Sequence, residues 1–286
     1  EMENNVVLTM RDISKTFPGV KALQHVDFTL RKGEIHALMG ENGAGKSTLI
    51  KVLTGVHPFE SGEIKMEGKA APIVNRSPQD AQDNGISTVY QEVNLCPNLT
   101  VAENLFIGRE PRKAGLIDWK TMNKKSTELL KDLQIDAKAT DKLEECSLAK
   151  QQMIAIARAV DMNCRVLILD EPTAGLDPRG RDEVLDQVSA LQRSRGITVI
   201  LVSHSMEDVA KYVDRLIVMN QGEVRFDGRP VEVFHHYKEL EEIGLAAPQT
   251  TYLMQELKKQ GADVNTDATT VEEAADAIEA WLKASK

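Results

Sequence analysis

The chain has few cysteines, few aromatic residues and no long apolar run. Its three cysteines, Cys96, Cys146 and Cys164, lack the spacing of a metal site, so we expect reduced thiols in ordinary packing. The longest apolar stretches, 166–169 and 197–202, are far shorter than the ~18 residues that a membrane-spanning helix needs. The first residues also lack a signal-peptide pattern. The sequence therefore predicts a soluble, cytoplasmic protein.

The chain also lacks a basic stripe. It carries 35 lysines and arginines against 44 acidic residues, a net charge of -9. Nucleic acids are bound through clustered basic side chains, so we expect no nucleic-acid partner. Residues 232–286 hold eleven acidic and five basic side chains. This shift in composition predicts a boundary near residue 232.

Apolar patterning indicates an α/β protein. Short β-type runs between residues 5 and 40 and at 62–70 predict a small antiparallel sheet region. Helical periodicity follows from about 101 to 160. The continuous apolar runs "RVLILD" and "ITVILVS" then suit a parallel sheet covered on both faces, with a helix between them. We therefore expect an α/β sheet with an inserted helical subdomain.

One glycine-rich segment has the chemistry of a phosphate loop. "GENGAGKST" follows the apolar run "HALM" and opens a helical pattern, which is the context that GxxxxGK[ST] requires. Glycines let backbone N–H groups converge on phosphate oxygens, and a chance match is the less favoured alternative. Lys46 would reach the β and γ phosphates, and Ser47 would hold Mg²⁺. The predicted ATP-binding residues are Gly40, Glu41, Asn42, Gly43, Ala44, Gly45, Lys46, Ser47 and Thr48.

Two adjacent carboxylates end the run "RVLILD". Successive strand residues point to opposite sides, so Asp170 and Glu171 can serve one site only if the chain turns there. Asp170 fits the Mg²⁺ shell through water, and Glu171 fits the residue that polarises the attacking water. A solvated strand end is the alternative, and the upstream phosphate loop counts against it.

The set "GENGAGKST", "VYQE", "LILDEP", "AGLD" and "LVSH" resembles the ATP-binding cassette (ABC) ATPases over residues 5 to about 230. The resemblance implies a P-loop NTPase fold of the ABC type, with an antiparallel β subdomain and a helical subdomain at about 96–162. It implies an ATPase domain at 5–231 and a small C-terminal helical domain at 232–286. ATP and Mg²⁺ are the implied ligands.

Further roles follow only from that resemblance. Phe17 takes the place of the aromatic that stacks on adenine, although packing is its ordinary role. Gln91 matches the glutamine that touches Mg²⁺ and the attacking water, and otherwise reads as a polar loop residue. His204 matches the histidine that contacts the γ-phosphate, rather than a simple polar cap. Asp177 matches the loop that signals across a dimer of two cassettes.

The segment "CSLAKQQ", residues 146–152, stands where the family usually has LSGGQ, and it has no glycine. In the family this signature segment meets the ATP of a second cassette, which assigns Ser147, Ala149 and Lys150 to the ATP-binding set. Ser147 is suited to N-cap the following helix. Lys150 opposes the helix dipole by about 0.3–1 kcal/mol, so it is either a solvated side chain or a charge placed for a phosphate.

The two parts of the chain resemble different importer ATPases. Residues up to about 173 resemble ribose and galactofuranose importer ATPases, and residues from about 174 resemble those of energy-coupling factor (ECF) importers, which suggests an engineered chimera or a divergent natural chain. The helical runs of the tail, "VEVFHHYKELEEI" among them, would then help pair two ATPases rather than form a solvated tail. His235 and His236 are expected to be surface residues.

Three functions follow from these resemblances. The first is the ATPase subunit of an importer, working as a homodimer or heterodimer at the inner face of the membrane with a transmembrane partner. The second is a chimeric ATPase that folds and binds ATP but has no matched transporter. The third is a non-transport ABC ATPase, which the absence of a basic arm disfavours.

Overall fold

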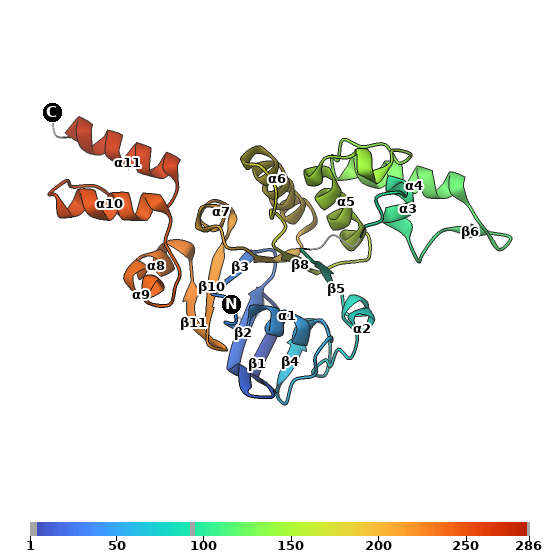
Figure 1. Cartoon of the computed structure of the whole chain (residues 1–286), viewed down its shortest axis with the longest axis horizontal. Coiled ribbons are helices and arrows are strands. Elements are labelled where there is room, and N and C mark those ends of the chain that lie inside the picture. The colour runs from blue at the N-terminus through green and yellow to red at the C-terminus, as the bar shows by residue number, and fades with distance from the viewer. Residues whose placement is uncertain (1–4, 92–94, 285–286) are drawn as a thin grey trace.

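The computed structural model describes residues 5–91 and 95–284. Its centre is a six-stranded sheet in the order β11-β10-β3-β9-β8-β5, drawn nearly edge-on in Figure 1. The five strands from β10 to β5 run parallel, and only β11 is antiparallel to its neighbour. The strands are β3 (Ile35–Met39), β5 (Ile86–Val89), β8 (Val166–Asp170), β9 (Thr198–Val202), β10 (Arg215–Asn220) and β11 (Glu223–Gly228).

A second, antiparallel sheet lies below the central one in Figure 1. It has the order β2-β1-β4, from β1 (Val6–Phe17), β2 (Val20–Arg31) and β4 (Ser61–Met66). Helix α1 (Lys46–Leu53) packs between the two sheets, and the short α2 (Pro78–Asp83) leads into β5. This is the antiparallel region that the sequence predicts.

The helical insertion comes between β5 and β8. It contains α3 (Val101–Phe106), the β6 (Arg112–Lys113) and β7 (Leu116–Ile117) hairpin, α4 (Trp119–Asp132), the 3₁₀ turn η2 (Leu143–Glu145) and α5 (Leu148–Val160). Thr100 opens α3 with a capping box, in which the Glu103 carboxylate accepts a hydrogen bond from the Thr100 N–H. The hairpin was not expected from the helical pattern, because its strands are only two residues long.

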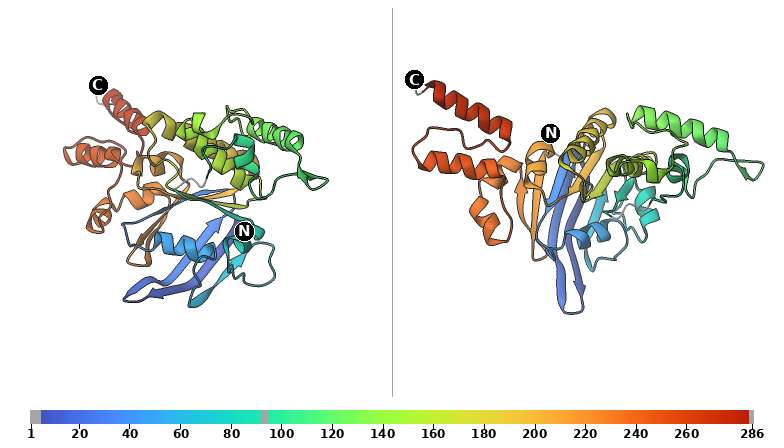
Figure 2. Two further views of the ribbon diagram at one scale, coloured as in Figure 1. Left: turned by 45° about the vertical axis from the view of Figure 1, so that its right-hand side comes forward. Right: turned by 45° about the horizontal axis from the view of Figure 1, so that its top comes forward.

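The chain after β8 alternates between helices and strands before it ends in helices. The first helices are α6 (Pro178–Arg195) and α7 (Met206–Tyr212). The tail contains α8 (Pro230–Phe234), α9 (Tyr237–Glu242), α10 (Gln249–Lys259) and α11 (Val271–Ala284). The helical run expected at 231–243 is therefore interrupted at His235–His236, and α8 spans the expected boundary at 231–232. Figure 2 shows α10 and α11 at the opposite end of the molecule from the insertion.

Three apolar cores surround the central sheet. The insertion core joins one face of the sheet to α3, α4, α5 and α6. The β-subdomain core joins the other face to α1 and the antiparallel sheet, and the C-terminal core joins the β10 side to α7, α8 and α9. All five residues of β3 are buried, and this strand contributes to all three cores: Ile35 to the first, Leu38 to the second, Ala37 and Met39 to the third.

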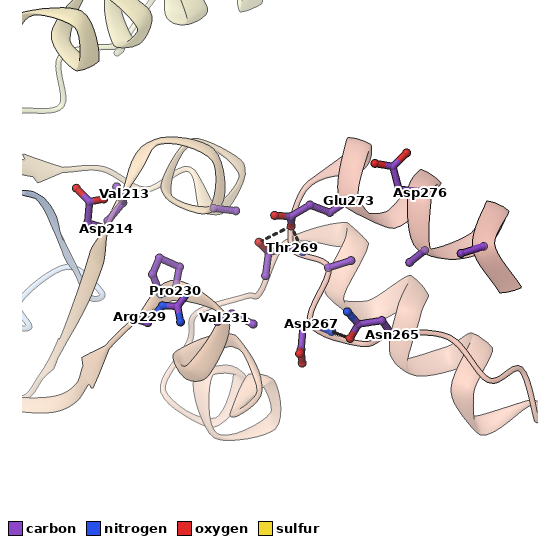
Figure 3. Close-up of a pocket in the computed structure, with 14 residues that line it drawn as sticks. Val213, Asp214, Arg229, Pro230, Val231, Asn265, Asp267, Thr269, Glu273 and Asp276 are labelled. Carbon is purple, nitrogen blue, oxygen red and sulfur yellow. Dashed lines mark hydrogen bonds between the residues drawn. The ribbon is translucent and has the colours of Figure 1, made fainter. Parts of the chain in front are cut away.

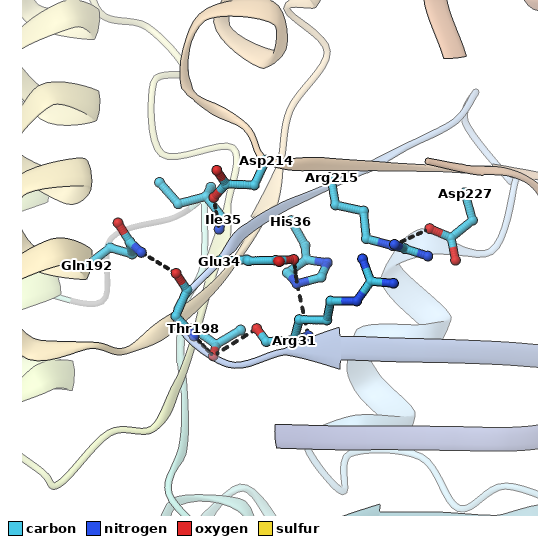
Figure 4. Close-up of polar contacts among 10 residues, drawn as sticks. Arg31, Glu34, Ile35, His36, Gln192, Thr198, Asp214, Arg215 and Asp227 are labelled. Carbon is cyan, nitrogen blue, oxygen red and sulfur yellow. Dashed lines mark hydrogen bonds and ion pairs between the residues drawn. The ribbon is translucent and has the colours of Figure 1, made fainter. Parts of the chain in front are cut away.

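A polar cluster lies at the amino end of β3, away from the glycine-rich loop that follows its other end (Figure 4). His36 is fully buried there, and its Nε2 accepts a hydrogen bond from the Arg31 N–H at 3.1 Å. Its Nδ1 is buried with no hydrogen-bond partner. Burial therefore lowers the pKa of His36 to about 4.

No helix within the described part of the chain is long and apolar enough to cross a membrane.

Candidate functional site

The predicted phosphate-binding and catalytic residues gather at one edge of the central sheet because the strands there are parallel and in register. Strand pairing aligns Leu38 and Asp170 with Val202, and Val89 with Leu169. The carboxyl ends of β3, β9, β8 and β5 therefore meet at one edge, where α/β sheets bind their ligands. The segments that leave this edge are the phosphate loop after β3, Asp170 and Glu171 at β8, His204 after β9 and Gln91 after β5.

The phosphate loop, residues 40–48, folds around the ammonium group of Lys46. Lys46 is 7% exposed, and its Nζ donates to the carbonyl oxygens of Gly40 at 2.6 Å and Glu41 at 3.2 Å. The loop needs its glycines, because a Cβ on Gly40 would lie 2.4 Å from the Met219 carbonyl oxygen. Gly45 precedes α1 with a φ of 107°. Ser47 is exposed in the first turn of that helix.

The two carboxylates at the end of β8 share one site because the chain turns between them. β8 ends at Asp170, and Glu171 has a φ of 50°, so the turn that the sequence analysis required is confirmed. The Glu171 N–H donates to the Val202 carbonyl at 3.0 Å, which ties the turn to β9. His204 Nε2 lies 3.1 Å from Glu171 Oε1, an ion-pair distance without hydrogen-bond geometry, so this buried oxygen has no hydrogen-bond partner.

Burial dominates the electrostatics of the site. Desolvation raises the pKa values of both Asp170 and Glu171, and the positive charges of Lys46 and His204 oppose this rise. Desolvation likewise lowers the pKa of Lys46, against the attraction of Glu171, Glu41 and Asp170. The site therefore holds a buried cation beside two carboxylates that take up protons more readily than exposed ones.

Gln91 and Phe17 lie at the margins of the site. Gln91 is exposed two residues after β5, at the same edge as Glu171, and the residues that follow it, 92–94, lie outside the described part of the chain. Phe17 ends β1 and is half-buried. Its ring meets the His57 ring edge-on at 5.2 Å, and Lys15 Nζ lies 5.3 Å from the ring centroid.

The signature segment forms a separate group with Asp177. Ser147 N-caps α5 through its hydroxyl oxygen, which accepts from the Lys150 N–H at 3.3 Å, so the predicted cap is confirmed. Lys150 Nζ lies 3.0 Å from Asp136 Oδ2, an intramolecular ion pair that the sequence analysis did not consider. Asp177 N-caps α6 by accepting from the Gly180 N–H at 2.7 Å. Residues 147–149 and Asp177 line one cleft of about 410 Å³.

The signature group and the phosphate loop belong to opposite faces of the central sheet. Helix α5 packs in the insertion core, and α1 packs in the β-subdomain core. Figure 1 shows the two helices on either side of the sheet. A single chain thus presents the two predicted ATP-contacting groups on different surfaces.

Sequence reasoning missed the side chains that hold these segments together. Arg181, in the first turn of α6, donates through Nη2 to Ser205 Oγ at 2.8 Å and Asp208 Oδ2 at 3.0 Å. Ser205 directly follows His204 and N-caps α7. Serine followed three residues later by an acid is a helix-start signal, so the cap was visible in the sequence, but the pairing with Arg181 was not.

A cavity of about 840 Å³ lies between the α7 and α8 region on one side and the chain from Asn265 to α11 on the other (Figure 3). The residues that line it are far from the phosphate loop in the sequence. Its lining includes Asp214, Arg229, Glu273 and Asp276.

The exposed histidines of the tail, His235 and His236, pair with Asp267 and Glu239. Over residues 5–91 and 95–284, no group of three or more His, Cys, Asp or Glu side chains is placed to hold a metal ion.

Comparisons with known proteins agree with this geometry. Residues 23–174 match the family described as ABC transporter. The galactofuranose transporter ATP-binding protein YtfR of Escherichia coli is 49% identical over 77% of this chain and 43% of its own length. The ribose import ATP-binding protein RbsA of Rhodopirellula baltica is 44% identical over the same shares. The chain thus spans about two fifths of the length of these curated relatives.

Solved structures confirm the predicted fold. A nucleotide-free ATP-binding cassette from an ABC transporter superposes with a TM-score of 0.73 at 28% identity, covering 84% of this chain and 99% of its own. The cbiO1 protein of Clostridium perfringens, part of the ABC transporter complex cbiONQ, gives 0.72 at 29% identity and covers 88% and 99%. With the parallel sheet edge, the phosphate loop and the matched residues, the chain belongs to the ABC transporter family.

Proposed function

We propose that this chain binds ATP and hydrolyses it with Mg²⁺, as the nucleotide-binding subunit of an ABC importer. The observation that carries the proposal is the buried ammonium of Lys46, held inside the glycine-rich loop beside the carboxylates of Asp170 and Glu171. A polyphosphate chelated by a divalent cation complements such a site, since it offers negative charge to Lys46 and a metal to the carboxylates.

The residues at the sheet edge fit both ligands. Lys46 is held by two backbone carbonyls and has no direct carboxylate partner among the described residues, so its charge is available to phosphate oxygens. The hydroxyl of Ser47, the amide of Gln91 and the carboxylate of Asp170 supply the oxygen atoms that Mg²⁺ prefers. When bound, Mg²⁺ would neutralise charge that develops on the phosphate oxygens. Phe17 would stack on the adenine.

In hydrolysis, Glu171 accepts a proton from the attacking water. Its buried carboxylate suits this role, because the raised pKa makes it a better proton acceptor than an exposed glutamate. His204 contacts the γ-phosphate and faces Glu171. The N–H groups of residues 40–48 bind the phosphates, so most of the catalysis is positioning and charge stabilisation.

We propose that the site is completed by a second ABC ATPase, in a homodimer or a heterodimer. Ser147, Ala149 and Lys150 would meet the partner's ATP, and Asp177 lines the same cleft as Ser147 and Ala149. The separation of α5 and α1 across the sheet supports this arrangement, since one chain does not bring both groups to one ATP. Residues 232–286 would help pair the two chains.

A transmembrane importer subunit is the proposed partner, which places the assembled protein at the inner face of the membrane. Similarity to the galactofuranose and ribose ATP-binding proteins supports a sugar importer. The alternative is an ECF-type tail on a sugar-type ATPase, joined near 173–178, with no matched transporter. The similarity of 77% of the chain to one sugar-importer ATP-binding protein supports the first proposal over this alternative. Pull-down with sugar-type and ECF-type membrane subunits separates the two.

The deciding experiment is Mg²⁺-dependent ATPase activity measured against protein concentration. We expect the rate per chain to rise with concentration, because hydrolysis needs the dimer. Lys46→Ala, which removes the cation of the phosphate loop and is purified in the same way, serves as the baseline for contaminating ATPases. A rate no higher than this baseline at every concentration would contradict ATPase activity, and a rate per chain that is constant would contradict the dimer.

A further inference from the structure

The phosphate loop has a neighbour from the C-terminal segment. Gly244 lies in the turn after α9 with a φ of 80°, and the side chain of Glu41 packs directly against it. A Cβ added to Gly244 would lie 2.9 Å from Glu41 Cγ and 3.0 Å from Cδ and Oε1. Only glycine therefore leaves room for the Glu41 side chain in its present position.

The turn that carries Gly244 is anchored on both sides. The Gly244 N–H donates to the Glu241 carbonyl at 3.0 Å, and the Leu245 N–H donates to the Leu240 carbonyl at 2.8 Å. The Leu240 and Leu245 side chains are buried in the C-terminal core, which also contains Ala37 and Met39 of β3. The turn and the strand that leads into the phosphate loop thus share one packed interior.

Glu41 is also the residue whose backbone helps hold Lys46. Its carbonyl oxygen accepts from the Ala44 N–H at 3.0 Å and from Lys46 Nζ at 3.2 Å. The side chain of Glu41 faces the C-terminal turn, whereas its backbone faces the phosphate-binding cation. The Cα of Glu41 thus joins the exposed side chain that meets the C-terminal turn to the carbonyl that holds Lys46.

We infer that Gly244 is a positioning residue for the phosphate loop, through which the C-terminal segment 230–247 sets the affinity of the loop for a nucleoside triphosphate. This inference rests on the proposed ATP-binding function and adds a regulator to that site. Because coupling between two sites is reciprocal, a bound triphosphate also stabilises the turn at Gly244.

The test is MgATP binding to the full chain, measured by isothermal titration calorimetry. Gly244→Ala should weaken binding by at least about fivefold, the lower end of typical coupling between sites. Gly244→Asn is the second variant: asparagine tolerates positive φ, so it adds the Cβ with less backbone strain and keeps the test valid if the alanine variant folds poorly.

The matched control is Gly261→Ala. Gly261 has a comparable φ of 93° in the same tail, but no atom lies within 4 Å of its added Cβ. This variant should be destabilised by backbone strain and bind MgATP as the parent does. In a Glu41→Ala background, the Gly244 substitutions should cause no further loss, because the side chain that the new Cβ meets is gone.

Parental affinity in both Gly244 variants would overturn the inference, as would an equal loss in the Glu41→Ala background or in Gly261→Ala. An unmodified chain that binds no MgATP would instead overturn the proposed function, and the inference with it.

Discussion

His204 Nε2 lies 3.1 Å from Glu171 Oε1, so the residues that follow two neighbouring strands, β9 and β8, meet at the sheet edge. The contact places the imidazole beside the one buried carboxylate oxygen of this turn that has no hydrogen-bond partner. The proposed base and the proposed γ-phosphate contact therefore act as a unit, and a change at either one alters the surroundings of the other.

Glu171→Gln should leave MgATP binding intact and reduce turnover by about 10²-fold or more, the lower range for loss of a general base. Glutamine keeps the shape of the side chain but cannot take the proton from water. Binding is measured by calorimetry and turnover by phosphate release. Hydrolysis at the parental rate would contradict the role of Glu171.

Lys150→Glu should lower the ATPase rate more than the ATP affinity of the single chain, because this side chain is proposed to act on a partner's nucleotide. Asp136→Ala is the control. It removes the ion pair with Lys150 at its fully exposed end, which should leave the free energy of unfolding nearly unchanged. Equal rates in Lys150→Glu and the parent would reject the role, and an equal fall in Asp136→Ala would assign the effect to the ion pair.

Arg181→Met should reduce the free energy of unfolding by about 1–3 kcal/mol, because it removes two hydrogen bonds and leaves the largely buried Asp208 carboxylate unpaired. We also expect a lower turnover, since Ser205 adjoins His204. Urea denaturation and phosphate release measure the two effects. Asp208→Asn in the Arg181→Met background should restore part of the stability, because the unpaired charge is removed. No restoration would contradict this account of the cluster.

The buried His36 predicts a loss of stability in acid. Its pKa is about 4 in the folded chain, against about 6.5 when unfolded. Between these values the unfolded chain binds a proton that the folded chain does not, so stability is greatest above pH 6.5 and falls as the pH drops towards 4. The cost at pH 4 is about 3 kcal/mol.

Urea denaturation across this pH range checks the prediction for His36. His36→Gln removes the titrating group, so its unfolding free energy should depend less steeply on pH than that of the parent. The same steepness in both proteins would show that other groups cause the acid sensitivity.

The sequence sufficed for the features that local patterns determine. The parallel strands, the phosphate loop at Gly40–Thr48 and the Ser147 cap each have a local signal, in apolar runs, in glycine spacing and in a helix-start residue. Shared chemistry at Asp170 and Glu171 requires a turn between them, and the φ of 50° at Glu171 provides it.

Contacts between distant segments had no such signal. Lys150 with Asp136, Arg181 with Asp208, and Glu41 with Gly244 each depend on how whole elements pack. The break at His235–His236 escaped prediction for a related reason. The apolar spacing of 231–243 is helical throughout, whereas α8 ends at Phe234 and α9 begins at Tyr237, and both helices pack in the C-terminal core.

Strand β3 contributes residues to three apolar cores, and the phosphate loop begins directly after its last residue. A change in any one of these cores therefore reaches β3, whose core residues lie between one and five positions before Gly40. Loosening of the small separate core of α10 and α11, which contains no β3 residue, should instead leave this loop untouched. Nucleotide affinity should accordingly report the structural integrity of the three cores that β3 joins, including regions with no chemical part in hydrolysis.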